Sequence, residues 1–531
     1  MFMRMNITTH LLRIRARPSS FFISLLSRCV RNLEQSGGTR WKQDRHLQTG
    51  VTRARDEGVF DQRNSKGSFS SMRITTGASC LEDQDVESYT IPGARVYERF
   101  FDCPLDYNDP AGETIKVFVR HLVPSDQVAK IKTLPFLLYL QGGPGFECGL
   151  PESISGWHKA AFSHGYQLLL MDQRGTGLSS AITARSLSTL SDDDARAAYL
   201  THFRADSIVR DCEYIRSALT DGLPNTKWSI IGQSFGGFCA ISYLSYFPES
   251  LDTAFITGGV APLVDNPDPV YRALYPRILQ RNNIYYRKFP RDQQRVRRIH
   301  AHLSQNKVIL PNGGTLSPRR FLQLGLLFGQ SGGYDTVHQA VVYCDNDLER
   351  LGALTTRSLT AIQRLQDWDT NVLYAILHES IYCQKGHTSA WSAERVLQEE
   401  PFKTQFEWRL ENLQPDQPVH FTGETIYPFM FEDYAELRPL KGTAEKIATS
   451  TRWGDLYDVD TLQKNQVRAV GVSYYDDMYV DLNLSVQTAS QIQGFQQWIT
   501  NEYAHNGVRA DGQRVFNYLK DLASGDQTYN K

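Results

Sequence analysis

The residues best suited to covalent chemistry lie in the pentapeptide Gly232-Gln-Ser-Phe-Gly236, where a serine stands between two glycines. The apolar residues 228–231 before it have the character of a strand, and the apolar residues 238–247 after it have the character of a helix. A sharp strand-to-helix turn has no room for side chains at the glycine positions, and it pushes the serine hydroxyl outward. Gly-x-Ser-x-Gly often occurs by chance, but in this context it predicts that Ser234 is a nucleophile.

A serine hydroxyl is a poor nucleophile at neutral pH, so a histidine must accept its proton and a carboxylate must hold the tautomer of that histidine. On this type of turn, the acid and then the histidine follow the serine along the chain. Only one of the thirteen histidines, His505, lies beyond residue 420. Because it follows a predicted last strand, residues 494–500, we expect His505 to be the base.

The acid is expected at the carboxyl end of the preceding strand, residues 467–475, which runs directly into Asp476 and Asp477. Adjacent residues of an extended chain point to opposite faces, so at most one of the two can reach His505. Asp481 is a weaker third candidate. The sequence pattern alone leaves the choice between Asp476 and Asp477 open.

A second glycine-rich segment, Gln141-Gly-Gly-Pro-Gly145, follows the apolar residues 134–140. Alone it would be read as a turn that closes a strand. Together with the serine turn, it predicts an oxyanion hole made by the backbone N–H groups of Gly143 and of Phe235, the residue after the nucleophile.

These residues need a rigid support, and the pattern of elements before residue 260 predicts one. Residues 134–140 and 166–171 are nearly continuous apolar runs, as in strands buried on both faces of a parallel sheet. Residues 206–219 have the spacing of an amphipathic helix and lead to the strand 228–231. Strand, helix and strand in this order predict an α/β fold with a mostly parallel sheet and right-handed crossovers.

The alternation of predicted strands and helices ends after residue 260. About two hundred residues of mainly helical sequence follow before the next strand-like run. We interpret this stretch as a large inserted lid. The expected organisation is a leader or linker at 1–85, a first part of the core at 86–260, the helical lid at 261–465, and a second part of the core at 466–531.

The formal net charge of −1 hides an uneven distribution. Residues 1–73 carry fourteen basic and five acidic side chains, and the first 33 residues have six arginines and no acid. This composition predicts a transit peptide for a chloroplast or mitochondrion, with a cytoplasmic protein as the alternative. The apolar run 21–26 is too short to span a membrane. The balanced total charge argues against a nucleic-acid-binding protein.

The eight cysteines are dispersed, without a Cys-x-x-Cys pair or a Cys/His cluster at metal-ligand spacing. The sequence therefore predicts neither a metal site nor a cofactor. It makes no prediction about the oligomeric state.

Five motifs in the same order resemble the prolyl aminopeptidase (proline iminopeptidase) family of α/β-hydrolase serine peptidases, over about residues 95–520. They lie at residues 141–145, 172–179, 232–237, 476–480 and 501–507. The resemblance implies an α/β-hydrolase fold, a Ser, Asp and His triad without metal or cofactor, and release of an N-terminal residue, typically proline, from peptides. Asp477 is the preferred acid because a methionine follows it as in the family. Gln141 departs from the pattern, because the family usually has histidine there.

An aminopeptidase must recognise a free α-ammonium group, and a buried carboxylate is its natural partner. Glu379 resembles an amine-binding glutamate of the family, and Glu424 is a second candidate in the lid. Both can equally be solvated carboxylates. Four lid tyrosines have two readings of equal weight, the wall of a proline pocket or ordinary packing: Tyr271, Tyr275, Tyr285 and Tyr286.

The sequence thus predicts a serine aminopeptidase that acts through an acyl-enzyme on peptides with a free N-terminus, preferentially proline. A carboxylesterase or amidase with the same triad is the nearest alternative. A ligand receptor on a hydrolase fold, with an intact triad and negligible turnover, is a more distant one.

Overall fold

The structure, a computed structural model, describes residues 78–81 and 86–526. The predicted transit peptide lies outside these residues. One nine-stranded sheet, in the order β1-β2-β3-β5-β4-β6-β7-β8-β9, organises the described chain. Its strands are β1 (Glu87–Ile91), β2 (Ala94–Pro104), β3 (Thr114–Pro124), β4 (Phe136–Leu140), β5 (Gln167–Asp172), β6 (Trp228–Gln233), β7 (Leu251–Thr257), β8 (Arg468–Tyr474) and β9 (Gln496–Thr500).

The sheet is antiparallel at its start and parallel for the rest. β1, β2 and β3 pair antiparallel, and β3 pairs antiparallel with β5. From β5 through β4, β6, β7 and β8 to β9 every pair is parallel. Parallel strands align their carboxyl ends along one edge of the sheet, so the loops that follow β4, β6 and β8 meet there. The predicted α/β-hydrolase fold with its mostly parallel sheet is confirmed.

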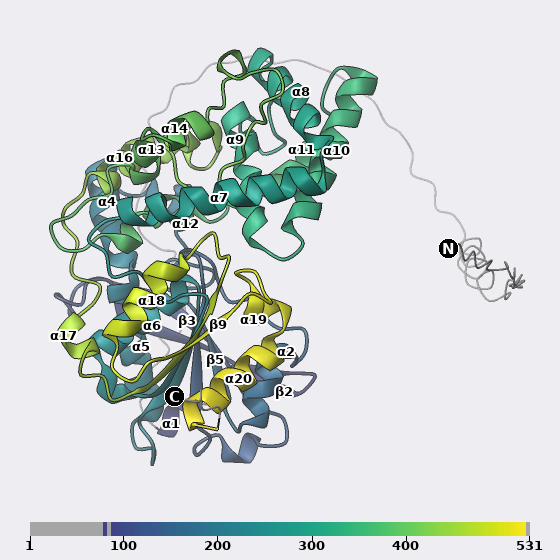
Figure 1. Ribbon diagram of the computed structural model, residues 1–531. Coiled ribbons are helices and arrows are strands. Elements are labelled where there is room, and N and C mark those ends of the chain that lie inside the picture. Colours follow the sequence, from purple (N-terminus) through teal and green to yellow (C-terminus); the bar gives the residue numbers. More distant parts are fainter. Residues whose placement is uncertain (1–77, 82–85, 527–531) are drawn as a thin grey trace, which may run out of the picture. The chain divides into compact units, whose positions relative to one another are not determined.

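Both faces of the parallel region are buried, which explains the continuous apolar runs. Along β4 and β6, alternate side chains enter two separate hydrophobic clusters: Leu138 and Ile230 enter one, Leu137 and Ile231 the other. The first cluster packs under α5 (Ala205–Thr220) and α6 (Phe235–Tyr246), and the second under α2 (Gly156–Ser163) and α20 (Gly512–Ser524). The strands are therefore held between two helical layers (Figure 1).

The helical insertion lies between β7 and β8, and we call it the cap. In Figure 1 its helices gather on one side of the sheet, coloured teal to green. They are α7 (Asp268–Lys288), α8 (Asp292–Gln305), α9 (Pro318–Leu322), α10 (Gly333–Leu351), α11 (Thr356–Gln363), α12 (Val372–Leu377), α13 (Ser392–Leu397), α14 (Phe402–Gln405), α15 (Met430–Asp433) and α16 (Lys441–Ala448). The last helix of the insertion, α17 (Val459–Leu462), instead packs against α6 of the sheet domain.

The remaining helices lie outside the insertion in the chain: α1 (Ala78–Leu81), α3 (Ala184–Leu187), α4 (Asp193–Leu200), α18 (Leu482–Gln491) and α19 (Gly507–Ala510). Of these, α4 packs against α16 of the cap. Short 3₁₀ turns occur at Val128–Lys130, Thr201–Phe203, Pro248–Ser250, Gln323–Gly329, Ser380–Tyr382, Leu410–Asn412 and Arg438–Leu440. Among the described residues, no helix is both long enough and apolar enough to cross a membrane.

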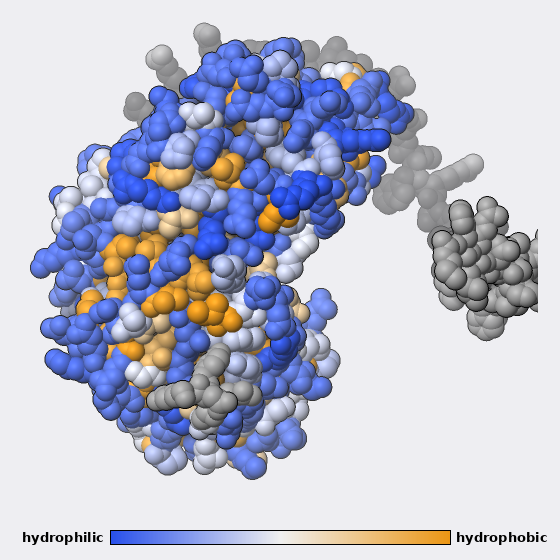
Figure 2. All heavy atoms as spheres, in the orientation of Figure 1, coloured by the Kyte–Doolittle hydropathy of each residue, from blue (hydrophilic) through white to orange (hydrophobic). Residues whose placement is uncertain are grey.

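Apolar side chains on the viewed face gather around α12 and α18, where the cap meets the sheet domain (Figure 2).

Candidate active site

Ser234 occupies the turn between β6 and α6 in a backbone conformation that side chains rarely adopt, with φ of 54° and ψ of −123°. The flanking glycines are sterically required. A Cβ at Gly232 would lie 2.2 Å from the carbonyl oxygen of Gly236, and one at Gly236 would lie 1.9 Å from that of Leu140. Both obstacles are backbone atoms that cannot turn aside. The sequence Gly-Gln-Ser-Phe-Gly therefore builds the strained turn that presents a serine side chain.

His505 and Asp477 form a hydrogen-bonded pair, with 2.7 Å between Nδ1 of His505 and Oδ2 of Asp477. The other carboxylate oxygen, Oδ1, accepts hydrogen bonds from the backbone N–H groups of Tyr479 and Val480, at 2.8 and 3.2 Å. Burial acts to lower the pKa of His505, but the charge of Asp477 and the hydrogen bond to it outweigh burial and raise this pKa above its ordinary value. The pair has the orientation of a base and its orienting acid.

The neighbouring carboxylates have other partners. The Asp476 side chain is 43% exposed and lies 3.8 Å from a guanidinium nitrogen of Arg277. Asp481 caps α18 by accepting hydrogen bonds from two backbone N–H groups of its first turn. Of the three candidates considered from the sequence, the structure thus places only Asp477 against His505.

Ser234 and His505 line the same cavity, which has a volume of about 300 Å³. Gly142 and Gly143, at the carboxyl end of β4, line it as well. The cap and neighbouring loops supply the other walls: Phe146, Gln233, Leu326, Leu327, Gln330, Arg364, Leu365, Asp367, Trp368, Tyr374, Glu424, Tyr479, Asn506 and Arg509. Residues from widely separated parts of the sequence therefore line one cavity with the serine.

Both residues expected to form the oxyanion hole lie beside the serine turn: Gly143 lines its cavity, and Phe235 follows Ser234 in the chain. Gly143 has φ of 132°, and a Cβ there would lie 2.8 Å from the ring of Phe146. Phe235 is the first residue of the twelve-residue helix α6, so its N–H has no partner within the helix. The Phe235 side chain is buried and does not line the cavity. Its backbone alone can serve the site.

Comparison with known proteins agrees with this geometry. Residues 135–325 match a family model described as the alpha/beta hydrolase fold. A proline iminopeptidase of Aeromonas sobria is 42% identical over 432 residues, which cover 81% of this chain and 97% of that protein. A proline iminopeptidase of Aspergillus aculeatus is 41% identical over 433 residues, 81% of this chain and 94% of that one. The chain belongs to the proline iminopeptidase family.

A solved proline iminopeptidase from Mycobacterium smegmatis is also similar in structure, with a TM-score of 0.37 and 11% sequence identity. The similarity covers 81% of this chain and 100% of that one.

Gln141, noted above as a departure from the expected family motif, holds the loop that follows β4. Its Oε1 accepts hydrogen bonds from the Tyr139 hydroxyl at 2.8 Å and from the Gly142 N–H at 3.1 Å, and its Nε2 donates to the carbonyl of Glu147 at 3.0 Å. The side chain therefore spans both ends of the loop, and the departure from the family pattern keeps a hydrogen-bonding role.

The segment 172–177, part of the 172–179 motif, supports this region. The Asp172 carboxylate accepts hydrogen bonds from the N–H groups of Cys148 and Leu178, at 2.9 and 3.0 Å. Arg174 forms a fully buried ion pair with Asp211, with 2.7 Å between Nε and Oδ2. Neither carboxylate lines the cavity.

Of the two glutamates expected to bind an amine, only Glu424 lines the cavity. It accepts a hydrogen bond from the Tyr374 hydroxyl. Its nearest basic partner, His378, lies at 4.0 Å, and burial lowers the pKa of that histidine, which favours the uncharged imidazole. The charge of Glu424 therefore has no cationic partner among the described residues and is free for a ligand.

Glu379 has a different task from the one expected. Its buried carboxylate accepts hydrogen bonds from the N–H groups of Ser392 and Ala393, at 3.1 and 2.8 Å, and does not line the cavity. Burial raises the pKa of Glu379 to about 7. Glu379 therefore ties the turn after α12 to the start of α13.

The aromatic walls were not identified from the sequence. Trp368 stacks on Tyr374 with ring centroids 4.2 Å apart, and Tyr479 meets the ring of His505 edge-on at 4.7 Å. Tyr479 lies in the 476–480 motif, which is the one local signal that pointed to it. The four lid tyrosines proposed as an alternative wall are all buried and none lines the cavity: Tyr271, Tyr275, Tyr285 and Tyr286.

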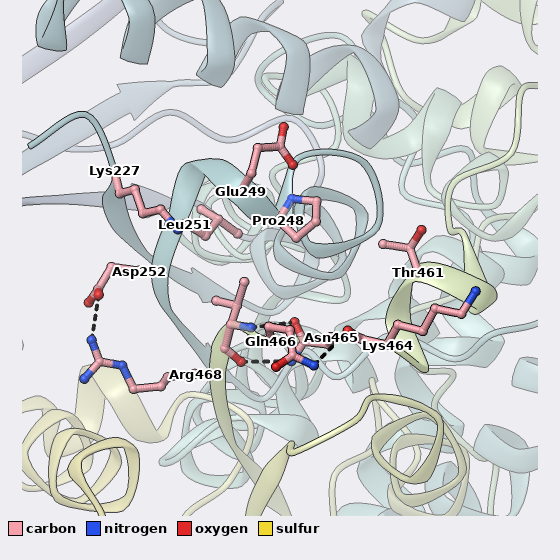
Figure 3. A pocket seen from close by; sticks show the side chains of 11 residues that line it. Lys227, Pro248, Glu249, Leu251, Asp252, Thr461, Lys464, Asn465, Gln466 and Arg468 are labelled. Carbon is pink, nitrogen blue, oxygen red and sulfur yellow. Dashed lines mark hydrogen bonds and ion pairs between the residues drawn. The ribbon is translucent and has the colours of Figure 1, made fainter.

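A larger cavity, of about 490 Å³, lies at the opposite edge of the sheet, where β6, β7 and β8 begin (Figure 3). Lys227, Asp252, Lys464 and Arg468 are among its lining residues, and Arg468 pairs with Asp252 at 2.6 Å. It contains neither a histidine nor a serine. The groups suited to peptide hydrolysis all lie at the smaller cavity.

Proposed function

We propose that this chain is a serine aminopeptidase that releases N-terminal proline from peptides. One observation carries the proposal: a strained Ser234, a histidine paired with a carboxylate, and Glu424, a carboxylate without a cationic partner among the described residues, face one cavity of about 300 Å³. Family membership, at 42% identity to a proline iminopeptidase, supports the same activity.

Acylation can begin at the cavity that Ser234 and His505 both line. The Ser234 hydroxyl attacks the carbonyl carbon of the first residue while Nε2 of His505 takes its proton. The N–H groups of Gly143 and Phe235 donate hydrogen bonds to the carbonyl oxygen as negative charge develops on it. The imidazolium then returns the proton to the leaving amine, and the remaining peptide departs from a prolyl-serine ester.

Deacylation repeats the steps with water. His505 takes a proton from the water as its oxygen attacks the ester, and it returns this proton to the Ser234 oxygen as proline leaves. Asp477 keeps the Nδ1 proton of His505 in place throughout, so that Nε2 is the nitrogen that exchanges protons. One water is consumed for each proline released, and no other reactant is needed.

Glu424 is the group we assign to the α-ammonium of the substrate. A charge-assisted hydrogen bond from a substrate ammonium would compensate the cost of keeping this carboxylate away from bulk water. The stacked pair Trp368 and Tyr374 and the ring of Tyr479 supply apolar walls suited to a pyrrolidine ring. The cap would thus supply most of the substrate selection, whereas the sheet domain supplies the triad chemistry.

The test compares proline naphthylamide, its N-acetylated form and an uncharged phenyl ester. We expect the free amine to be hydrolysed best, and Glu424→Gln to lower kcat/KM for it by about 10- to 100-fold, as for removal of a charged hydrogen-bond partner. Glu432, an exposed glutamate that pairs with Lys441, is the matched control, and Glu432→Gln should change nothing.

Two outcomes would replace the proposal. Hydrolysis that survives N-acetylation, with the ester as the better substrate, would identify a carboxylesterase or amidase. A folded protein whose Ser234 does not react with a fluorophosphonate would favour a receptor. Ser234→Ala is the control for labelling at this serine.

We also propose that residues 1–73 direct the protein to a chloroplast or mitochondrion, on the basis of their fourteen basic and five acidic side chains. N-terminal sequencing of the mature protein checks this, and a mature protein that starts at Met1 would contradict a cleaved leader.

A further inference from the structure

The cavity that holds Ser234 carries positive as well as negative side chains. Arg364, next to the C-terminal end of α11, and Arg509, on α19, both line it and both are exposed. Within the described chain, neither guanidinium forms an ion pair, although Arg509 lies 3.4 Å from Oε1 of Gln141. Two cations therefore stand at the rim without an ion-pair partner among the described residues.

Several other arginines of the described chain have carboxylate partners. Arg174 pairs with Asp211, and Arg298 pairs with Asp345 and Glu349. The rim has its own carboxylate, Asp367, which lines the same cavity but lies beyond ion-pair distance of both rim arginines. Burial raises the pKa of Asp367.

These charges match the two ends of a short peptide. Glu424, shielded by Tyr374, suits an ammonium group, and the exposed arginines suit a carboxylate. Fully extended, a dipeptide spans about 7 Å and a tripeptide about 10 Å. Both are short enough to keep their two charged ends within one cavity, whereas a long peptide carries its carboxylate away.

We propose that Arg364 and Arg509 bind the C-terminal carboxylate of the substrate, so that free di- and tripeptides with N-terminal proline are preferred substrates. The inference rests on the proposed aminopeptidase activity, and it names a substrate class within that activity. Because both guanidinium groups are exposed, solvent weakens their attraction for a carboxylate. We expect a preference of about fivefold to tenfold in kcat/KM for a peptide acid over its amide.

The experiment measures kcat/KM for Pro-Gly-Gly and for Pro-Gly-Gly-amide, which differ only in the terminal charge. The wild-type enzyme should prefer the acid. Arg364→Gln and Arg509→Gln should each lower the acid-to-amide ratio, and the double variant should bring it close to one. Because the ratio is taken within each variant, a general change in turnover or in the folded fraction cancels.

Two further variants sharpen the test. Asp367→Asn removes the rim carboxylate and should increase the ratio. Arg287→Gln alters an exposed arginine of α7 that does not line the cavity and should leave the ratio unchanged. Raising the salt concentration should lower the ratio of the wild-type enzyme, because the attraction is screened. That measurement needs no variant to fold.

The outcomes separate the two proposals. If proline naphthylamide and both peptides resist hydrolysis, the proposed function fails. If they are hydrolysed but the wild-type ratio is near one, or if the double variant keeps the wild-type ratio, carboxylate binding by these arginines is refuted. A ratio that does not respond to salt would refute it as well.

Discussion

The contacts of Asp477 allow a sharp prediction for the substitution Asp477→Asn. Oδ1 of this residue is held by the N–H groups of Tyr479 and Val480, and only an oxygen can accept those two hydrogen bonds. The asparagine must therefore place its amide oxygen there and turn its NH₂ group toward His505. Nδ1 of the imidazole can accept a hydrogen bond from this NH₂ group only if the ring proton is on Nε2. In that tautomer Nε2 cannot take the proton of Ser234.

The expected loss in kcat is about 10³- to 10⁴-fold, as for tautomer inversion in serine hydrolase triads. This corresponds to about 4 to 5.5 kcal/mol of activation free energy. Asp476→Asn is the matched control. Its side chain is 43% exposed and 3.8 Å from Arg277, so its loss should cost less than about 1 kcal/mol of stability and change kcat by less than about twofold.

The assay is steady-state hydrolysis of proline naphthylamide as a function of pH. His505 is active only when neutral, and Asp477 raises its pKa, so Asp477→Asn should move the acidic limb of residual activity to lower pH. The reasoning is refuted if Asp477→Asn retains kcat within tenfold of the wild type. It is refuted too if Asp476→Asn is the variant that loses activity, or if the acidic limb moves to higher pH.

Three further predictions concern stability. Gly236→Ala puts a Cβ 1.9 Å from a backbone oxygen and should cost at least about 3 kcal/mol in urea unfolding, whereas Gly149→Ala, with open space around it, should be close to neutral; equal effects would contradict the steric argument. Arg174→Met leaves the carboxylate of Asp211 buried without its partner and should cost about 3 to 5 kcal/mol by the same measurement; a loss below about 1 kcal/mol would show that the ion pair is not needed. The raised pKa of Glu379, about 7 in the folded state against an ordinary 4.5, means that the unfolded chain releases this proton first as pH rises. Stability should therefore fall by about 3 kcal/mol between about pH 4.5 and 7, and Glu379→Gln should flatten that part of the stability profile; an unchanged slope would refute the assignment.

The sequence pointed to much of the site because its main signals are local. The serine turn needs glycines at fixed positions, and chain order leaves His505 as the one histidine after the last cap residues. The choice between Asp476 and Asp477 depends on how the chain turns after β8, which ends at Tyr474. The alternation of side chains between the two faces of a strand does not apply in this turn, where hydrogen bonds to Oδ1 of Asp477 hold the backbone. It therefore could not predict which of the two side chains points toward His505.

The amine site lacked such a local signal. Glu379 and Glu424 both lie in irregular, mainly apolar cap sequence, and only the packing of α12 and α13 turns the first away from the cavity. The wall formed by Trp368, Tyr374 and Tyr479 brings together residues about a hundred positions apart. No periodicity in a single segment encodes that arrangement, because it depends on how the cap lies on the sheet domain.

The position of the cap also sets the order in which the enzyme can assemble. β7 and β8 are hydrogen-bonded neighbours, yet about two hundred residues of cap separate them in the chain. During synthesis β6, the strand before the nucleophile, leaves the ribosome before β8, so β7 at first lacks its hydrogen-bonded neighbour on one side. Asp477 and His505 are synthesised only after the whole cap. A nascent chain therefore holds a serine without its base until the residues that follow the cap are made. Hydrolytic activity is withheld until the strands that close the sheet, and with them the proton acceptor, have been synthesised.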